Sequence, residues 1–236
     1  MIKYNFLILS LSSLLLSTHT AYCSDYLWFY NLSIKSDYRS RGISQTGNKP
    51  ALQAAIDFYH QPSGFLSGIW ISNVDSSKQG FDGANFETDF YLGWEHIWEN
   101  TTVKLLAYRY QYFNTRIKDY NTNEYWFIVK QSFKQFTIEA TATYSDNWYG
   151  TGHSNYYIGE LTLPILKQFS FSARYGRNTF SHILLESYSD YEIKISCPIL
   201  GLNISLSYIN NNINKNYCYQ PFNCDTRFVF SLSKDL

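Results

Sequence analysis

Apolar and polar residues alternate with a period of two along most of the chain after residue 27. The clearest case sets Phe86, Phe90, Leu92 and Trp94 on one side of a segment whose other side is mostly polar. About twelve such segments follow one another, and no stretch repeats its apolar residues at helical spacing. Because successive side chains of a strand point to opposite faces of a sheet, the pattern predicts an all-β chain.

The same alternation recurs in four later segments, at 136–145, 169–175, 191–197 and 202–208. The third and fifth segments, which begin after residues 64 and 101, alternate less clearly, so their faces are not assigned. The final segment, 227–236, also carries an apolar stripe. An apolar alternation at the C-terminus is expected of an outer-membrane insertion signal, which makes the barrel-assembly machinery an expected partner.

The connections between segments distinguish a barrel from a soluble sandwich, which would also alternate. Every second connection is short, at 61–64, 98–101, 133–135, 164–167 and 198–201. The others are longer, at 42–49, 76–83, 114–121, 146–153, 177–186 and 210–219. This alternation is typical of a transmembrane barrel with short periplasmic turns and longer extracellular loops. We expect a single antiparallel transmembrane β-barrel of about twelve strands over residues 24–236, with a soluble secreted β-protein as the alternative.

The first residues have the features of an export signal. Lys3 precedes an apolar run over residues 6–16, and Ala21-Tyr22-Cys23 follows. The run is too short to span a bilayer, so residues 1–23 are predicted to be a cleaved secretory signal peptide. Lipidation of Cys23 is the alternative. Together with the barrel pattern, this predicts the outer membrane of a Gram-negative bacterium.

Composition and charge narrow the class of partners. The 236 residues carry 19 Lys and Arg against 19 Asp and Glu, so the formal net charge is zero and no nucleic-acid partner is expected. Aromatic residues make up 19% of the chain, which excludes a disordered protein. Tyr and Trp favour membrane interfaces, which fits a barrel among outer-membrane lipids and lipopolysaccharide.

Charged residues collect on the polar side of the segments, as expected if the apolar side meets lipid. The pore-lining candidates are Lys35, Asp37, Arg39, Arg41, Asp57, Glu87, Asp89, Glu139, Arg174, Glu192, Lys194 and Arg227, and Glu95 and Glu160 lie on the same side. These charges could line a water-filled pore or pair across the interior and fill it, and a twelve-strand barrel is of a size that allows either.

Arg39 and Arg41 lie two residues apart where the first segment ends, on what alternation predicts to be its lumen face near the outer rim. Two guanidinium groups there could attract an anionic solute or bind lipopolysaccharide phosphates. They could instead pair with Asp37, Asp57 or Glu87 and hold the first loop.

Cysteines and histidines give little sign of chemistry. Cys218 and Cys224 are disulfide candidates in an oxidising compartment, with two free thiols as the alternative, and Cys197 is expected to pack as a small apolar side chain. The one grouping that resembles a catalytic triad is Asp146 with His153 and Ser154. Adjacent side chains point to opposite sides of a strand, so no catalytic residue is predicted. No metal ligands or cofactor are predicted either, since His60, His96 and His182 are scattered.

Four stretches of the sequence carry a family resemblance: SDYRSRGISQT at 36–46, KPALQ at 49–53, SNVD at 72–75 and VFSLSK at 229–234. Together they resemble the TorF-type porin family of proteobacterial outer membranes, although members of that family often end in Phe and this chain ends Asp235-Leu236. The resemblance implies an outer-membrane barrel, and the porin label of that family carries no assigned substrate.

The sequence as a whole predicts a passive, weakly selective channel for small hydrophilic solutes or ions rather than an enzyme. The alternative is a closed structural or surface-interaction barrel that acts through its external loops.

Overall fold

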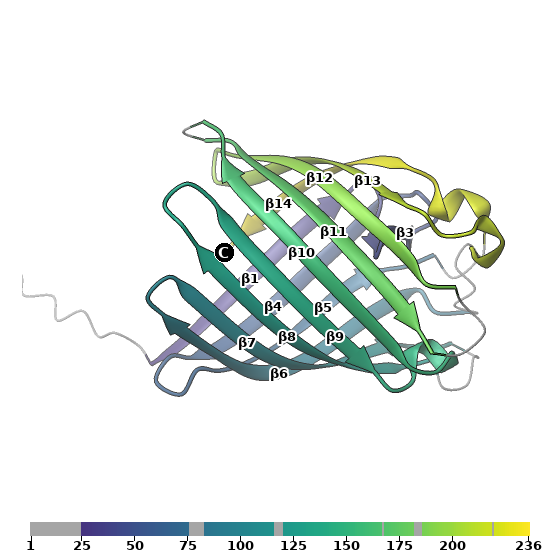
Figure 1. Cartoon of the computed structure of the whole chain (residues 1–236), viewed down its shortest axis with the longest axis horizontal. Coiled ribbons are helices and arrows are strands. Elements are labelled where there is room, and N and C mark those ends of the chain that lie inside the picture. The colour runs from purple at the N-terminus through teal and green to yellow at the C-terminus, as the bar shows by residue number, and fades with distance from the viewer. Residues whose placement is uncertain (1–24, 76–82, 116–119, 167, 182–185, 219) are drawn as a thin grey trace, which may run out of the picture.

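The chain forms a closed barrel of twelve antiparallel strands in the computed structural model, which describes residues 25–75, 83–115, 120–166, 168–181, 186–218 and 220–236 (Figure 1). The strands are β1 (Tyr26–Lys35), β4 (Ala51–His60), β5 (Phe65–Asn73), β6 (Phe86–Trp98), β7 (Thr101–Tyr112), β8 (Thr122–Ser132), β9 (Thr137–Ser145), β10 (Ser154–Pro164), β11 (Ser170–Phe180), β12 (Tyr188–Ile199), β13 (Leu202–Asn211) and β14 (Arg227–Asp235). The predicted fold class, a single antiparallel barrel of about twelve strands, is confirmed.

Strands that follow one another along the chain are neighbours around the barrel, and β14 closes it against β1. The closing register pairs Asn31 with Asp235 and Lys35 with Ser231. Closure pairs the last strand with the first, as a barrel inside lipid requires, because a free backbone N–H or C=O there has no water to bind.

Connections alternate between short and long, as the sequence predicted. The turn between β12 and β13 holds only Leu200 and Gly201, both with positive φ (53° and 75°), as in a two-residue type I′ turn. At the opposite end of the barrel lie the long connections and the short 3₁₀ helices η1 (Trp148–Gly150), η2 (Lys215–Tyr217) and η3 (Pro221–Cys224) (Figure 1).

The barrel exposes apolar side chains on its outer face and buries polar ones inside, which is the reverse of a soluble protein. Leu92, Leu105 and Ile193 are 56%, 51% and 44% exposed on its outer face, whereas Glu124 and Asn178 are completely enclosed. An apolar outer belt around a polar interior is the arrangement of a barrel surrounded by lipid.

Two expectations fall outside the described residues: the signal peptide over residues 1–23 and the position of His182. In the part of the chain that is described, no helix has the length and apolar character needed to cross a membrane.

Candidate functional site

The connection between β1 and β4 folds into the barrel as a small hairpin. Its strands β2 (Arg39–Ser40) and β3 (Ile43–Ser44) pair Arg39 with Ser44 and Ser40 with Ile43. The turn residues Arg41 and Gly42 both have positive φ (49° and 80°), as a type I′ turn requires. A Cβ on Gly42 would lie 2.9 Å from that of Asp190 and 3.0 Å from that of Asn211, so the hairpin tip lies against the inner wall.

The expectation that residues 37–41 extend the lumen face of the first strand is wrong. β1 ends at Lys35, and Asp37, Arg39 and Arg41 belong to the connection and its hairpin. The carboxylate of Asp37 accepts hydrogen bonds from Ser44 Oγ (2.6 Å) and Thr46 Oγ1 (3.0 Å). These bonds close the segment on itself, so it does not continue the strand.

Arg41 crosses the interior to the wall formed by β8 and β11. Its guanidinium forms an ion pair with Glu124 and donates to Asn178 Oδ1 at 2.9 Å. It also lies over the rings of Trp148 and Tyr156, 3.8 and 4.4 Å from their centroids. Burial acts to lower the pKa of Arg41, but the charge of Glu124, its hydrogen bond and the nearby Tyr110 and Tyr156 together outweigh burial, so the pKa is raised. The prediction that Arg41 pairs with Asp37, Asp57 or Glu87 is therefore wrong, since its acidic partner is Glu124.

Glu124 accepts most of the hydrogen bonds that surround the guanidinium of Arg41. Besides Arg41, its carboxylate accepts hydrogen bonds from Tyr110 Oη (2.8 Å), Trp126 Nε1 (2.8 Å) and Thr143 Oγ1 (2.6 Å). A buried carboxylate with this many hydrogen-bond donors is held in one position. The hairpin is therefore fixed to a rigid point on β8.

Arg39 holds the base of the hairpin. It pairs with Asp37 at 2.7 Å, one of the partners that the sequence analysis considered, and donates to the carbonyl oxygens of Gly42 (3.0 Å) and Asp225 (2.7 Å). Burial lowers the pKa of Arg39, and the charge of Asp37 offsets part of that effect. Arg39 thus joins the first connection to the last one, which contains Asp225.

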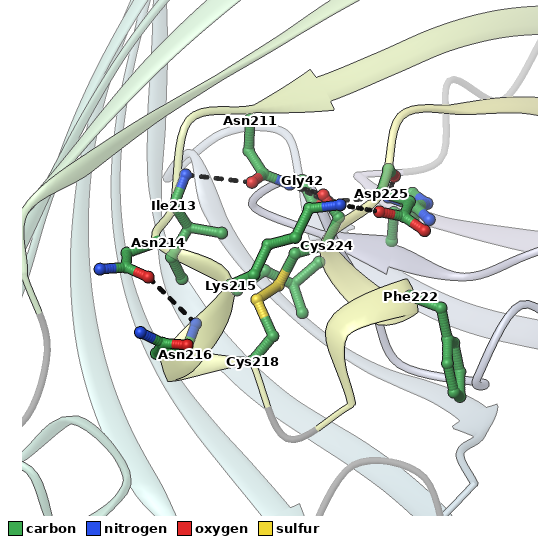
Figure 2. The surroundings of a disulfide bond; sticks show 12 residues. Gly42, Asn211, Ile213, Asn214, Lys215, Asn216, Cys218, Phe222, Cys224 and Asp225 are labelled. Atoms are coloured by element: carbon green, nitrogen blue, oxygen red, sulfur yellow. Dashed lines mark hydrogen bonds and ion pairs between the residues drawn. A yellow bond between two sulfur atoms is a disulfide. The ribbon is translucent and has the colours of Figure 1, made fainter.

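The last connection, between β13 and β14, packs against the hairpin and contains a disulfide between Cys218 and Cys224 (Figure 2). Asn211 Nδ2 donates both to Gly42 O (2.9 Å) and to Cys224 O (3.2 Å). Asn48 Nδ2 donates to Phe222 O at 3.2 Å. The disulfide-bonded segment 218–224 therefore helps to hold the hairpin in place, and we call this segment the latch.

Two cavities remain inside the barrel beside the hairpin. The larger, about 410 Å³, is lined by Arg41 and Arg174 and by a wall of aromatic rings. The smaller, about 320 Å³, is lined by Lys35, Lys194 and small polar residues, and reaches Asn203 and Ser233 near the short-turn end. Both border Arg39 and Glu192, so the hairpin narrows the interior without filling it.

The pore-lining candidates divide into three groups. Eight border one cavity or the other: Lys35, Asp37, Arg39, Arg41, Asp89, Arg174, Glu192 and Lys194. Asp57 and Glu87 are interior and accept hydrogen bonds from the hydroxyls of Tyr91 and Tyr38 respectively. Glu139, half-buried and paired in register with Glu160, and Arg227, exposed on β14, border neither cavity.

Six residues that complete the interior were not predicted from the sequence: Glu124, Asp190, Tyr108, Tyr110, Trp126 and Tyr156. Asp190 pairs with Arg174 at 2.8 Å, and Arg174 also donates to Tyr156 Oη at 2.6 Å. On β7 and β8 the inner face is itself aromatic, so polarity does not mark it.

The triad-like grouping does not assemble. His153 Nδ1 lies 3.1 Å from Tyr144 Oη on an exposed surface, whereas the Ser154 side chain is buried. Within the described ranges, no cluster of three or more His, Cys, Asp or Glu side chains could hold a metal ion.

Comparison with known proteins places the chain in a family. Residues 20–236 match the family Gcw_chp, described as a bacterial protein of unknown function, so the chain belongs to that family. The resemblance to TorF-type porins is not tested by this match and stays a prediction. A search of curated proteins finds no match.

The barrel is also similar to solved structures. Likeness to the KdgM porin has a TM-score of 0.58 at 7% identity and covers 88% of this chain and 97% of that one. Likeness to the NanC porin has a TM-score of 0.56 at 9% identity and covers 86% and 97%. At such identities the likeness concerns the fold.

Proposed function

We propose that this member of the Gcw_chp family is an outer-membrane channel through which small hydrophilic solutes or ions diffuse passively. The observation that carries the proposal is the pair of cavities, each bordered by charged side chains, inside a barrel whose outer face is apolar. Likeness in fold to two porins supports it. The hairpin 39–44 is the element that narrows the channel.

The charged interior gives the channel its preference for hydrophilic solutes. Charges lining a narrow, water-filled passage create local fields that act on a passing solute. In this proposal Lys35, Arg39, Arg174, Glu192 and Lys194 line the passage, because they border the two cavities. We further propose that residues 1–23 direct export and are removed, and that lipopolysaccharide surrounds the outer rim.

Swelling of proteoliposomes that contain the refolded chain tests the proposal. Swelling should be fast in small neutral sugars and should slow as the sugar becomes larger, because the hairpin limits the passage. Correct folding is checked separately by heat-modified migration on a gel. A folded, inserted protein that gives no more swelling than empty liposomes would replace the channel with the closed, surface-interacting barrel.

A further inference from the structure

Asp89 on β6 lies within an aromatic surface of the barrel wall. Its partners in register on the two neighbouring strands are Trp70 on β5 and Tyr110 on β7. Tyr91 lies two residues further along the same strand and hence on the same face. All four side chains border the 410 Å³ cavity.

The aromatic surface continues on both sides of Asp89. Ring centroids lie 4.9 Å apart for Tyr91 and Tyr108, 5.1 Å for Tyr108 and Trp126, and 5.3 Å for Tyr38 and Trp70. Each of these rings also borders the cavity. A small ligand in this space would therefore meet ring faces and edges along with the carboxylate of Asp89.

In the described part of the chain, every charged side chain that borders the cavity forms an ion pair except Asp89, since Glu192 shares Arg174 with Asp190. Arg39, Arg41 and Arg174 border the cavity, and each has a carboxylate partner, namely Asp37, Glu124 and Asp190 respectively. Asp89 is 7% exposed, its Oδ1 has no hydrogen-bond partner, and it forms no ion pair within the described ranges. A buried carboxylate in this state is costly, and a cation that reaches it removes that cost.

Aromatic rings around a lone carboxylate suit an organic cation better than a bare metal ion. Ring faces attract cations, and aromatic cages that hold quaternary ammonium groups use this attraction. The same cavity already holds one organic cation in this way, since the guanidinium of Arg41 lies over Trp148 and Tyr156. Its volume of about 410 Å³ is within the usual range for small-molecule sites.

We propose that the cavity between Asp89 and the aromatic wall binds the substituted ammonium group of a small organic cation. The inference rests on the proposed channel function and deepens it: the site would be a binding station that favours such solutes during passage. Asp89 supplies the charge, and Trp70, Tyr91, Tyr108 and Trp126 supply the ring surfaces.

Calorimetric titration of the folded protein in detergent micelles tests the site without requiring transport. Choline is the probe, and 3,3-dimethyl-1-butanol, its uncharged carbon analogue, is the matched control ligand. Choline should bind at least tenfold more tightly than the alcohol. Asp89→Asn should abolish this preference, whereas Glu139→Gln, a half-buried carboxylate that does not border the cavity, should leave it unchanged.

A second variant, which keeps Asp89, tests the aromatic part of the site in case Asp89→Asn fails to fold. Trp70→Leu should weaken choline at least fivefold while keeping a preference for choline over the alcohol, because Asp89 remains. Equal affinity for choline and the alcohol in the wild type would overturn the site. Displacement of choline by an equal concentration of K⁺ would overturn its assignment to organic cations.

The outcomes separate the site from the channel. Choline binding in micelles by a protein that is silent in bilayers would refute the channel and leave the site standing. Transport of small solutes by a protein without choline preference would refute the site and leave the channel.

Discussion

Arg41 at the tip of the inward hairpin and Glu124 on β8 form a buried ion pair that joins the first long connection to the far wall of the barrel. The pair makes the hairpin a fixed part of the interior rather than a free external loop. The size of the passage therefore depends on a few contacts that mutation can remove one at a time.

Removal of Glu124 should release the hairpin. Glu124→Ala leaves the buried guanidinium of Arg41 without its acidic partner, and breaking a buried pair in this way costs about 3–5 kcal/mol of unfolding free energy. Urea unfolding in lipid vesicles measures the change. Lys49→Ala, which breaks the exposed pair with Asp75, is the control and should cost less than about 1 kcal/mol. Similar losses in both variants would contradict the role of the buried pair.

Gly42 should tolerate no side chain. Gly42→Ala adds a Cβ that meets Asp190 and Asn211 at a turn position with φ of 80°, so the tip must move away from the wall. Gly201→Ala is the matched control, since its φ is 75° but no atom lies within 4 Å of an added Cβ. Both carry the backbone cost of about 1 kcal/mol, and only Gly42→Ala should also raise channel conductance. An equal conductance in the two variants would show that the tip contact does not limit the passage.

The disulfide should stabilise the latch on the hairpin. The two cysteines are six residues apart, and closing so short a loop is worth about 2 kcal/mol in the chain-entropy account. The double variant Cys218→Ser, Cys224→Ser should show more frequent current fluctuations than the wild type. Adding a reductant to the wild type should reproduce this effect, and Cys197→Ser should not. A steady current in the double variant would mean that the latch holds without the bond.

An added charge should lower the unfolding free energy much more on the outer face of a strand than on its inner face. Ile193→Arg places a cation on the outer face near the middle of β12 and should cost about 2–4 kcal/mol of unfolding free energy in lipid. Ser205 on β13 borders the 320 Å³ cavity, so Ser205→Arg should cost much less unfolding free energy. Unfolding in vesicles compares them. A larger loss for Ser205→Arg would reverse the assignment of faces.

Sequence pattern was sufficient for the barrel because most strands have one polar and one apolar face. Strands β6, β9 and β11–β13 alternate cleanly, and the connection lengths then give the antiparallel order. The pattern was weak where the interior is aromatic. Tyr110 and Tyr112 of β7 point inward and are buried, so the inner side of that strand does not stand out as polar in the sequence.

The candidate site was only partly predictable. The charges of Asp37, Arg39 and Arg41 were singled out, but alternation placed them on a strand, since a hairpin of two-residue strands keeps the same period. Glu124 precedes the continuous apolar run 125–129, and without alternation in that run the sequence does not indicate which way Glu124 points. Its partnership with Arg41 spans 83 residues, and only the closed barrel brings the two together.

Single-channel recording in planar bilayers tests whether the hairpin narrows an open barrel, by comparing the wild type with a variant in which a Gly/Ser linker of equal length replaces residues 38–48. The wild type should give discrete current steps and the variant larger steps, because the hairpin narrows an otherwise open barrel. A folded, inserted wild type that passes no current, or a variant whose steps are no larger, would contradict this expectation.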